Sequence, residues 1–160
     1  MTAQRTPADV QAALDAAGLA IRVRVMEGST ATAQQAADSI GTDLGSIVKS
    51  LCFLVDGQAV LVLAAGDRTV DDRKLAGHYG VSRKKVRIAD ADTTIAVTGY
   101  APGGVPPLGH ARPLPVLIDA SLGRFATVYA AGGSPRTIFP ISFALLVEAT
   151  GGQVLELAKG

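Results

Sequence analysis

The chain has 160 residues, 48% of them hydrophobic and 18% charged, with a formal net charge of +1 and one cysteine. These values exclude a polyelectrolyte binder and a disulfide-stapled domain, and the length favours one domain, residues 1–160, that buries about two-thirds of its unfolded surface. No apolar stretch is long enough to cross a bilayer and residues 1–9 lack the layout of a secretory signal, so we expect a cytoplasmic protein without membrane contact.

Capping residues indicate the first elements of the chain. At residues 6–9, a threonine N-cap, a proline at the first helical position and an acid in the first turn predict a helix that ends near Gly18. Residues 21–25 alternate apolar side chains with arginines, which is typical of a half-exposed strand. A second capping pattern at residues 32–35 predicts a helix that runs to about Ile40.

Two apolar runs, residues 51–55 and 59–65, predict neighbouring strands. The Asp-Gly pair between them is a strong hairpin signal, and the continuous apolar character indicates strands buried on both faces. Cys52, within the first run, is interpreted either as a small buried side chain or as a nucleophile. Because no basic group or helix start lies beside it, the sequence favours the buried side chain.

Lys49 is the charged residue of the apolar run 47–55. On an extended strand it shares a face with Ile47, Leu51 and Phe53, and we expect this face to point into the fold. A cation in such a place is unfavourable unless it meets an anion or a polar ligand. Lys49 is therefore a candidate functional residue.

The middle of the chain is rich in basic residues. Residues 69–72 are expected to cap a helix that ends at Gly80, and a short basic helix or turn follows from Ser82. Two interpretations of the charge stay open, a face that binds phosphates or a solvated surface balanced by nearby aspartates. The residues of this basic segment are Arg68, Arg73, Lys74, Arg83, Lys84, Lys85 and Arg87.

The C-terminal part combines strands with one helix. Strands are predicted at residues 115–118, 126–130, 136–139 and 154–157, and a helix at residues 141–150. Helices and hairpin-linked strands do not alternate strictly along the chain. A mixed sheet flanked by helices is therefore favoured over a Rossmann arrangement.

Residues 99–110 form a predicted loop rich in glycine and proline. Its prolines stiffen the chain and its glycines allow close approach to the main chain, so free amides near Gly103 to Val105 could bind a carbonyl or an oxyanion. A purely structural crossover loop explains the segment equally well. His110, at the end of the loop, either contacts the same ligand or is satisfied by the backbone. The spacings of a metal site and of a Walker-type phosphate loop are not present.

Four stretches together resemble one known family: residues 32–37, 47–53, 103–110 and 128–133. They occur in the family's order, and the resemblance extends from about residue 30 to residue 157. The lysine motif combined with the Gly-x-x-x-Pro element at residues 103–107 is its most specific part. The family is the YbaK/EbsC group of free-standing aminoacyl-tRNA deacylases, related to the editing domain inserted in bacterial prolyl-tRNA synthetases.

The resemblance implies an α/β fold with a mixed, partly barrel-like sheet flanked by helices. It implies hydrolysis of the ester that joins a wrong amino acid to tRNA, typically tRNA for proline, without cofactor or metal. Lys49 would be essential and lie near the 3′ end of the tRNA, the loop backbone would position the aminoacyl group, and water or a ribose hydroxyl would attack. Carried onto this chain, the catalytic residues are Lys49, Gly103, Gly104 and Pro107. The substrate-binding residues are Val105, Pro106, His110, Ala131, Gly132 and Gly133.

The chain departs from the family pattern at two places. Family members often carry a serine at the position of Ala131 and an acid near the start of the last helix, where residues 141–143 are Ile-Ser-Phe. These departures bear on which amino acid is removed more than on the reaction. Two other functions stay open, a non-catalytic tRNA- or partner-binding module and a hydrolase of small aminoacyl esters. Prolyl-tRNA synthetase is a candidate partner.

Overall fold

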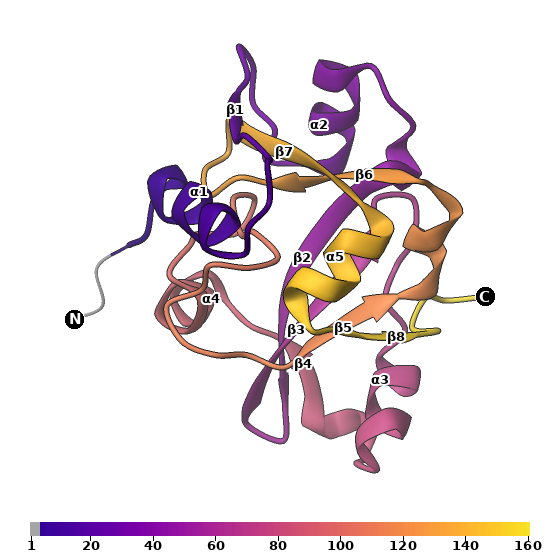
Figure 1. The fold of residues 1–160 in the computed structure, drawn as a ribbon. Helices are drawn as coiled ribbons and strands as arrows, with labels where there is room; N and C mark the ends of the chain where they lie inside the picture. Colours follow the sequence, from indigo (N-terminus) through magenta and orange to yellow (C-terminus); the bar gives the residue numbers. More distant parts are fainter. Residues whose placement is uncertain (1–3) are drawn as a thin grey trace.

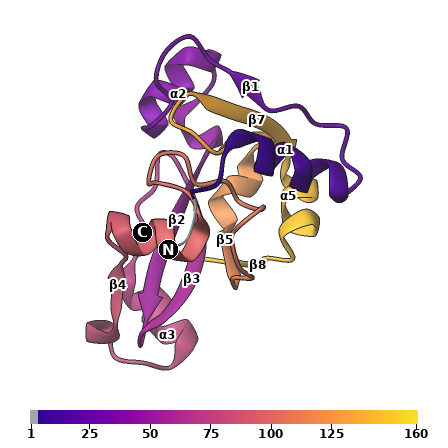
Figure 2. The ribbon, with the colours of Figure 1, turned by 90° about the vertical axis from the view of Figure 1, so that its left-hand side faces the viewer.

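An eight-stranded mixed sheet forms the centre of the computed structural model, which describes residues 4–160 (Figures 1 and 2). Its strands are β1 (Arg24–Val25), β2 (Ile47–Val55), β3 (Gln58–Ala65), β4 (Val86–Ile88), β5 (Val116–Asp119), β6 (Thr127–Ala131), β7 (Thr137–Ser142) and β8 (Gln153–Leu155). They are ordered β1-β7-β6-β2-β3-β5-β8, and β4 pairs with β2 beside this path. The predicted mixed sheet is confirmed. Residues 1–3, part of the stretch without a secretory pattern, lie outside the described residues.

Short helices lie around the sheet. The α-helices are α1 (Pro7–Ala16), α2 (Ala33–Ile40), α3 (Asp72–Tyr79), α4 (Ala91–Thr98) and α5 (Phe143–Thr150), and the 3-10 helices are η1 (Leu44–Ser46), η2 (Arg83–Lys85) and η3 (Ala120–Arg124). Within residues 4–160, no helix has the length and apolar character needed to span a membrane.

The sheet is buried on both faces at β3. Leu61 and Leu63 pack on one face in a core that also holds Leu14 of α1 and Leu146 of α5. The residues that alternate with them belong to the opposite face, where Leu75 of α3 covers the sheet. The prediction of a hairpin strand buried on both sides is thus confirmed, because helices cover the two faces.

Strand β2 has three partners. It forms the predicted antiparallel hairpin with β3 from Val48 to Val55. Its other edge pairs in parallel with β6 at Ile47 and Val48, and with β4 only from Phe53 onward. The stretch between these two pairings is not covered by a strand, and this uncovered edge positions the site described below.

The predicted strand at residues 21–25 was too long, since only Arg24 and Val25 pair with β7. The reason is a competing side chain: the Gln11 amide donates to the Ile21 carbonyl at 2.9 Å and accepts from the Val23 amide at 2.9 Å. The main-chain groups of this segment are therefore satisfied by α1 instead of by a neighbouring strand.

Other boundaries differ because tertiary contacts override local signals. Helix α3 is capped by Asp71 and not from Thr69, since Val70 forms an isolated β-bridge with Ala158. Helix α5 starts two residues later than predicted, because β7 continues to Ser142 and this serine serves as the N-cap. Helix α4 and strand β4 were not predicted at all.

Candidate functional site

A cavity of about 310 Å³ lies at the uncovered edge of β2. Four segments meet there: the end of the β1–α2 connection with the start of α2, the first half of β2, the glycine-proline loop, and β6 with β7. Its wall is made mostly of small aliphatic side chains. The lining residues are Thr30, Ala31, Thr32, Ala33, Ala36, Ile47, Val48, Lys49, Ser50, Leu51, Gly103, Val105, Tyr129, Ala130, Ala131 and Ile138.

Lys49 contributes the one charge among these lining residues. Its ammonium Nζ donates a hydrogen bond to the carbonyl oxygen of Arg68 at 2.5 Å, and it forms no ion pair with any carboxylate of residues 4–160. Burial lowers the pKa of Lys49, and the negative charge of Asp67 opposes this shift. Lys49 is thus a partly desolvated cation whose charge is free to meet an anionic or polar ligand.

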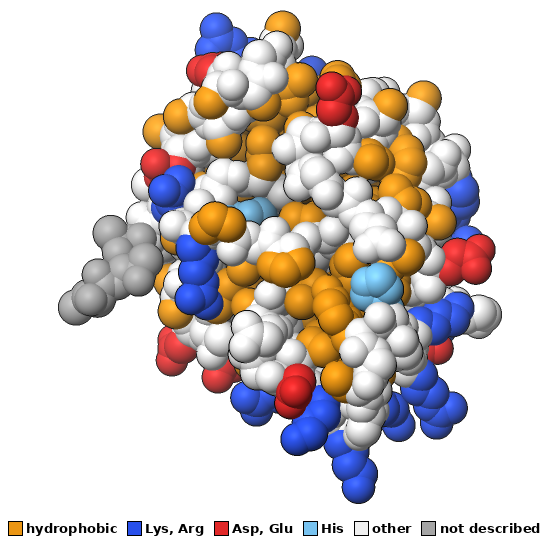
Figure 3. All heavy atoms as spheres, turned by 60° about the horizontal axis from the view of Figure 1, so that its bottom comes forward, with side chains coloured by type: hydrophobic (Ala, Val, Ile, Leu, Met, Phe, Trp, Pro, Cys, Tyr) orange, Lys and Arg blue, Asp and Glu red, His pale blue; other side chains and the backbone are white. Residues whose placement is uncertain are grey.

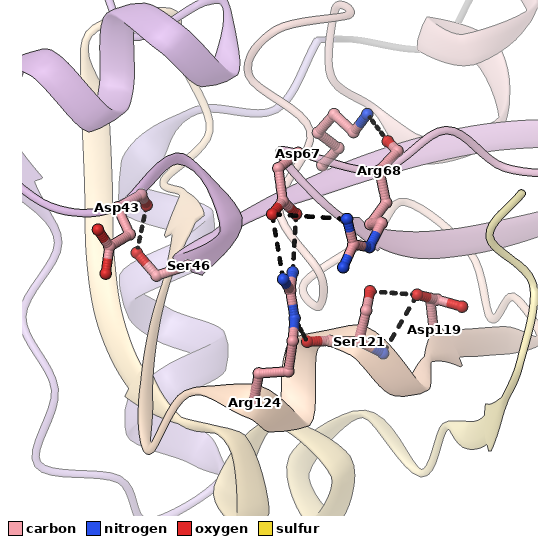
Figure 4. A network of polar contacts seen from close by, with 8 residues as sticks. Asp43, Ser46, Asp67, Arg68, Asp119, Ser121 and Arg124 are labelled. Carbon is pink, nitrogen blue, oxygen red and sulfur yellow. Dashed lines mark hydrogen bonds and ion pairs between the residues drawn. The ribbon is translucent and has the colours of Figure 1, made fainter. Parts of the chain in front are cut away.

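An ion pair fixes the segment that holds Lys49. The Arg124 guanidinium donates two hydrogen bonds to the Asp67 carboxylate, at 2.7 and 3.1 Å, and a third from Nε to the Ser121 carbonyl at 2.6 Å (Figure 4). The hydrogen bond from Arg124 holds the pKa of Asp67 below its ordinary value. Because Asp67 immediately precedes Arg68, this pair positions the carbonyl group that receives the Lys49 ammonium.

The glycine-proline loop is fixed at its base by the N-terminal segment. The Arg5 amide donates to the Gly99 carbonyl at 2.7 Å, and the Tyr100 hydroxyl donates to the Gly109 carbonyl at 2.8 Å. At the end of the loop, His110 Nε2 lies 2.7 Å from the Pro106 carbonyl. Burial lowers the pKa of His110, although its bond to Pro106 opposes the shift. The two ends of the loop are therefore pinned in place.

The structure brings four of the predicted site residues together in the cavity: Lys49, Gly103, Val105 and Ala131. Within residues 4–160, the amides of Gly103 and Val105 have no hydrogen-bond acceptor, which leaves them available to a carbonyl. The Gly104 amide is not free, because it donates to the Ala101 carbonyl at 3.0 Å. The expectation of free amides throughout 103–105 is corrected at this position.

The other predicted residues do not line this cavity. Pro106 is buried, and Pro107 and His110 line a separate hollow of about 340 Å³. A side chain at Gly132 would meet Val23, and one at Gly133 would meet the Pro7 backbone, so both glycines are packed against the N-terminal part of the chain. The backbone interpretation of His110 agrees with its bond to Pro106.

The sequence did not point to several residues of the site. Thr30 is held there by its amide, which donates to the Pro135 carbonyl at 2.6 Å. Asp67 and Arg124 are 57 positions apart and meet only in the folded chain. Tyr129 lies within the stretch 128–133 that carries the family resemblance, and this was the one available signal for it.

The seven residues of the basic segment are all exposed. Lys and Arg side chains gather along the lower edge of the face shown in Figure 3. Lys85 lies 4.0 Å from Asp56, and Arg68 lies 3.9 Å from Asp67. In the described part of the chain, no ion pair is formed by Arg73, Lys74, Arg83, Lys84 or Arg87.

Fold and cavity together define a small α/β protein that offers one lysine and free main-chain amides to a small ligand. Residues 27–149 match the model of a family described as the aminoacyl-tRNA editing domain. The chain therefore belongs to the aminoacyl-tRNA editing domain family, and the resemblance found in the sequence is confirmed at this level.

Individual relatives agree with this assignment. The uncharacterized protein YwhH of Bacillus subtilis (strain 168) is 42% identical over 121 residues, which is 75% of each chain. A proline–tRNA ligase of Staphylococcus aureus (strain Newman) is 34% identical over 77 residues, 48% of this chain but only 13% of the ligase. A crystal structure described as a candidate trans-editing enzyme for prolyl tRNA synthetase has a TM-score of 0.89 and 38% identity, covering 96% of this chain and 97% of that chain.

Proposed function

We propose that this protein is a trans-editing deacylase that hydrolyses the ester of mischarged aminoacyl-tRNA. The proposed substrate is tRNA for proline that carries a small non-cognate amino acid. The observation that carries the proposal is the meeting of Lys49 with Gly103 and Val105 in one cavity of about 310 Å³. The family and the trans-editing structural neighbour support the same reaction.

In this proposal, Lys49 binds the 3′ end of the tRNA through its charge. The free amides of Gly103 and Val105 donate hydrogen bonds to the ester carbonyl and stabilise the oxyanion that forms when this carbonyl is attacked. A bond forms between the carbonyl carbon and the attacking oxygen, and the ester bond to the ribose breaks. The ribose oxygen takes up the proton that the attacking water releases, which leaves an amino acid and an uncharged tRNA.

The oxygen that ends up in the released amino acid is assigned to water. A ribose hydroxyl that attacked first would move the aminoacyl group to its own oxygen, and water would then cleave this new ester. Cys52 is 3% exposed and does not line the cavity, and burial raises the pKa of its thiol, so it is a poor nucleophile. His110 is committed to the Pro106 carbonyl outside the cavity. The alanines of the wall leave room for a small aminoacyl group, which supports a small amino acid as the one removed.

The basic segment is assigned to the tRNA backbone. Its seven side chains are exposed, and five of them have no carboxylate partner in the described residues. Unpaired surface cations attract phosphates without regard to sequence, and such binding weakens as salt concentration rises.

A deacylation screen tests the proposal. Transfer RNA for proline charged with Ala, Cys, Ser, Thr or 2-aminobutyrate is incubated with the protein, and correctly charged tRNAs serve as controls. We expect hydrolysis of at least one mischarged species, and loss of this activity in Lys49→Ala with an unchanged circular dichroism spectrum. Lys159→Ala, which removes an exposed lysine that does not line the cavity, is the matched control.

Three outcomes would contradict the assignment. Full activity of Lys49→Ala would remove the lysine from the mechanism. Saturable tRNA binding without hydrolysis of any charged tRNA would favour a binding module. Turnover of free aminoacyl esters, with no preference for tRNA, would favour a small-molecule hydrolase.

A further inference from the structure

Two hydroxyl groups at the cavity have no hydrogen-bond partner. Thr30 is 6% exposed, and its Oγ1 is buried without a partner in residues 4–160. The Ser50 Oγ is also buried and has no hydrogen-bond partner in residues 4–160. Both residues line the cavity. Buried polar groups are nearly always paired, because an unpaired one loses its bonds to water without replacement. Two such groups at one small cavity indicate that their partner is a ligand.

The main chain of Ser50 faces the same gap. On the side of β4, the Cys52 carbonyl accepts from the Ala89 amide at 2.9 Å. Residues two apart on a strand direct their main-chain groups to the same side, so Ser50 presents its N–H and C=O toward this edge as well. Pairing with β6 ends at Val48, and pairing with β4 begins at Phe53, so no strand covers Ser50. Ser50 therefore adds a main-chain acceptor to the two hydroxyls.

The cavity has two polar sides, the loop amides on one and the groups of Thr30 and Ser50 on the other. The free amides of Gly103 and Val105 are donors and suit the ester carbonyl. Thr30 and Ser50 supply hydroxyl oxygens and one carbonyl oxygen, all of which can accept hydrogen bonds. None of the lining residues is a carboxylate, and Lys49 is their one cation. A group that donates hydrogen bonds must therefore be held by these neutral acceptors.

In an aminoacyl ester, the α-amino group is such a donor and lies one carbon from the ester carbonyl. The side chain of the amino acid would contact the rest of the wall, which is formed by the methyl groups of alanines together with Ile47 and Ile138. Ser50 is not a nucleophile, since its hydroxyl has no base as a hydrogen-bond partner. Its place beside the carbonyl site suits a residue that binds the substrate.

We propose that Thr30 and Ser50 bind the α-amino group of the aminoacyl ester, so that the cavity selects esters whose α-amine is free. This inference rests on the proposed function, because it takes the ligand to be an aminoacyl group. Thr30 and Ser50, whose hydroxyls have no partner within residues 4–160, are then the specificity-determining residues of the site.

The test compares Thr30→Val and Ser50→Ala with the wild-type protein on two matched ligands. One is 3′-alanylamino-3′-deoxyadenosine, an amide that resists hydrolysis, and the other is its N-acetylated form. We expect wild-type protein to bind the free amine at least tenfold more tightly by calorimetry. Each variant should lose most of this preference by weaker binding of the free amine. The same ratio is then measured for hydrolysis of alanyl-tRNA and N-acetylalanyl-tRNA.

A stability measurement separates this role from a structural one. The Thr30 hydroxyl has no partner to lose, so Thr30→Val should not lower the midpoint of urea unfolding. Thr98→Val is the matched control, since the buried Thr98 hydroxyl donates to the Thr94 carbonyl at 2.7 Å. It should lower the midpoint and leave the ligand preference unchanged.

The outcomes are distinguishable from those of the proposed function. Equal binding of the two ligands by wild-type protein, no binding of either, or an unchanged preference in both variants would overturn the role of Thr30 and Ser50. A preference that depends on Thr30 without any deacylation would support this role and contradict the proposed reaction instead.

Discussion

Replacement of Gly103 by alanine tests whether the position of the glycine-proline loop matters. Gly103 has a φ of +89°, in the left-handed region that alanine adopts at a cost of about 1–2 kcal/mol. A Cβ atom there would lie 3.1 Å from the carbonyl oxygen of Ala31 and 3.2 Å from its Cβ. The loop or the Ala31 segment must therefore shift by a few tenths of an ångström.

Gly57 provides a matched control. It has a similar φ of +81° at the tip of the β2–β3 hairpin, but a Cβ atom there would meet nothing within 4 Å. We expect Gly57→Ala to lose about 1–2 kcal/mol of unfolding free energy, and Gly103→Ala to lose about 2–4 kcal/mol because crowding adds to the strain. Urea denaturation at equilibrium measures both values.

Deacylation activity should distinguish the two variants. A misplacement of about 1 Å can cost a hundredfold in rate, so a shift of a few tenths of an ångström should lower kcat/KM of Gly103→Ala about tenfold. Gly57→Ala should deacylate mischarged tRNA at the wild-type rate at a temperature where both variants are folded. If Gly103→Ala is destabilised as expected but retains full kcat/KM, the loop does not position the ester and the reasoning fails.

Three further predictions follow from the polar contacts. Asp67→Asn should cost about 1 kcal/mol of stability by weakening the pair with Arg124, and should lower the pKa of Lys49 further, as measured by NMR titration of labelled lysine. Asp119→Ala should lower the unfolding free energy in urea by about 3 kcal/mol. The buried carboxylate accepts hydrogen bonds from two main-chain amides, at 2.7 and 3.0 Å, and these amides would lose their partner. The pKa of His110 is lower in the folded chain than in the unfolded chain. As pH falls, His110 is therefore protonated in the unfolded chain at a higher pH than in the folded chain, and this favours unfolding. Stability should therefore decline from about pH 7 to pH 5, and His110→Gln should flatten this decline.

Each of these predictions has a contradicting result. An unchanged or higher Lys49 pKa in Asp67→Asn would show that the Asp67 charge does not reach the ammonium. Wild-type stability of Asp119→Ala would mean that water replaces the carboxylate. An identical pH profile for His110→Gln would assign the acid sensitivity to another group.

The sequence predicted those parts of the site that are visible at single positions. Lys49 stood out because a charge within an apolar run has few structural explanations, and it does line the cavity. Gly103 stood out because a glycine between prolines marks a shaped main chain. The hydrogen bond of the Gly104 amide could not be predicted, since it depends on the conformation of the whole loop.

The parts that were missed are tertiary or locally ambiguous. Thr30 reaches the cavity through a main-chain contact with Pro135, which lies far away in the sequence. Helix α4 was not predicted because β-branched residues such as Ile95 and Val97 lower its helix propensity. Its formation is supported by Asp90, whose side chain accepts from the Thr93 amide at 2.8 Å.

The free main-chain groups around the cavity have a consequence for how such a protein diverges. A substitution changes a side chain but leaves an amide or a carbonyl in place, so the reaction can be inherited while the wall varies. In the proposed reaction, exchanges at Ala31 or Ala131 would change the accepted amino acid without rebuilding the groups that bind the ester. Paralogues with different substrates could arise from this scaffold by single substitutions, and a library restricted to the aliphatic wall is the natural starting point for directed evolution of new editing specificities.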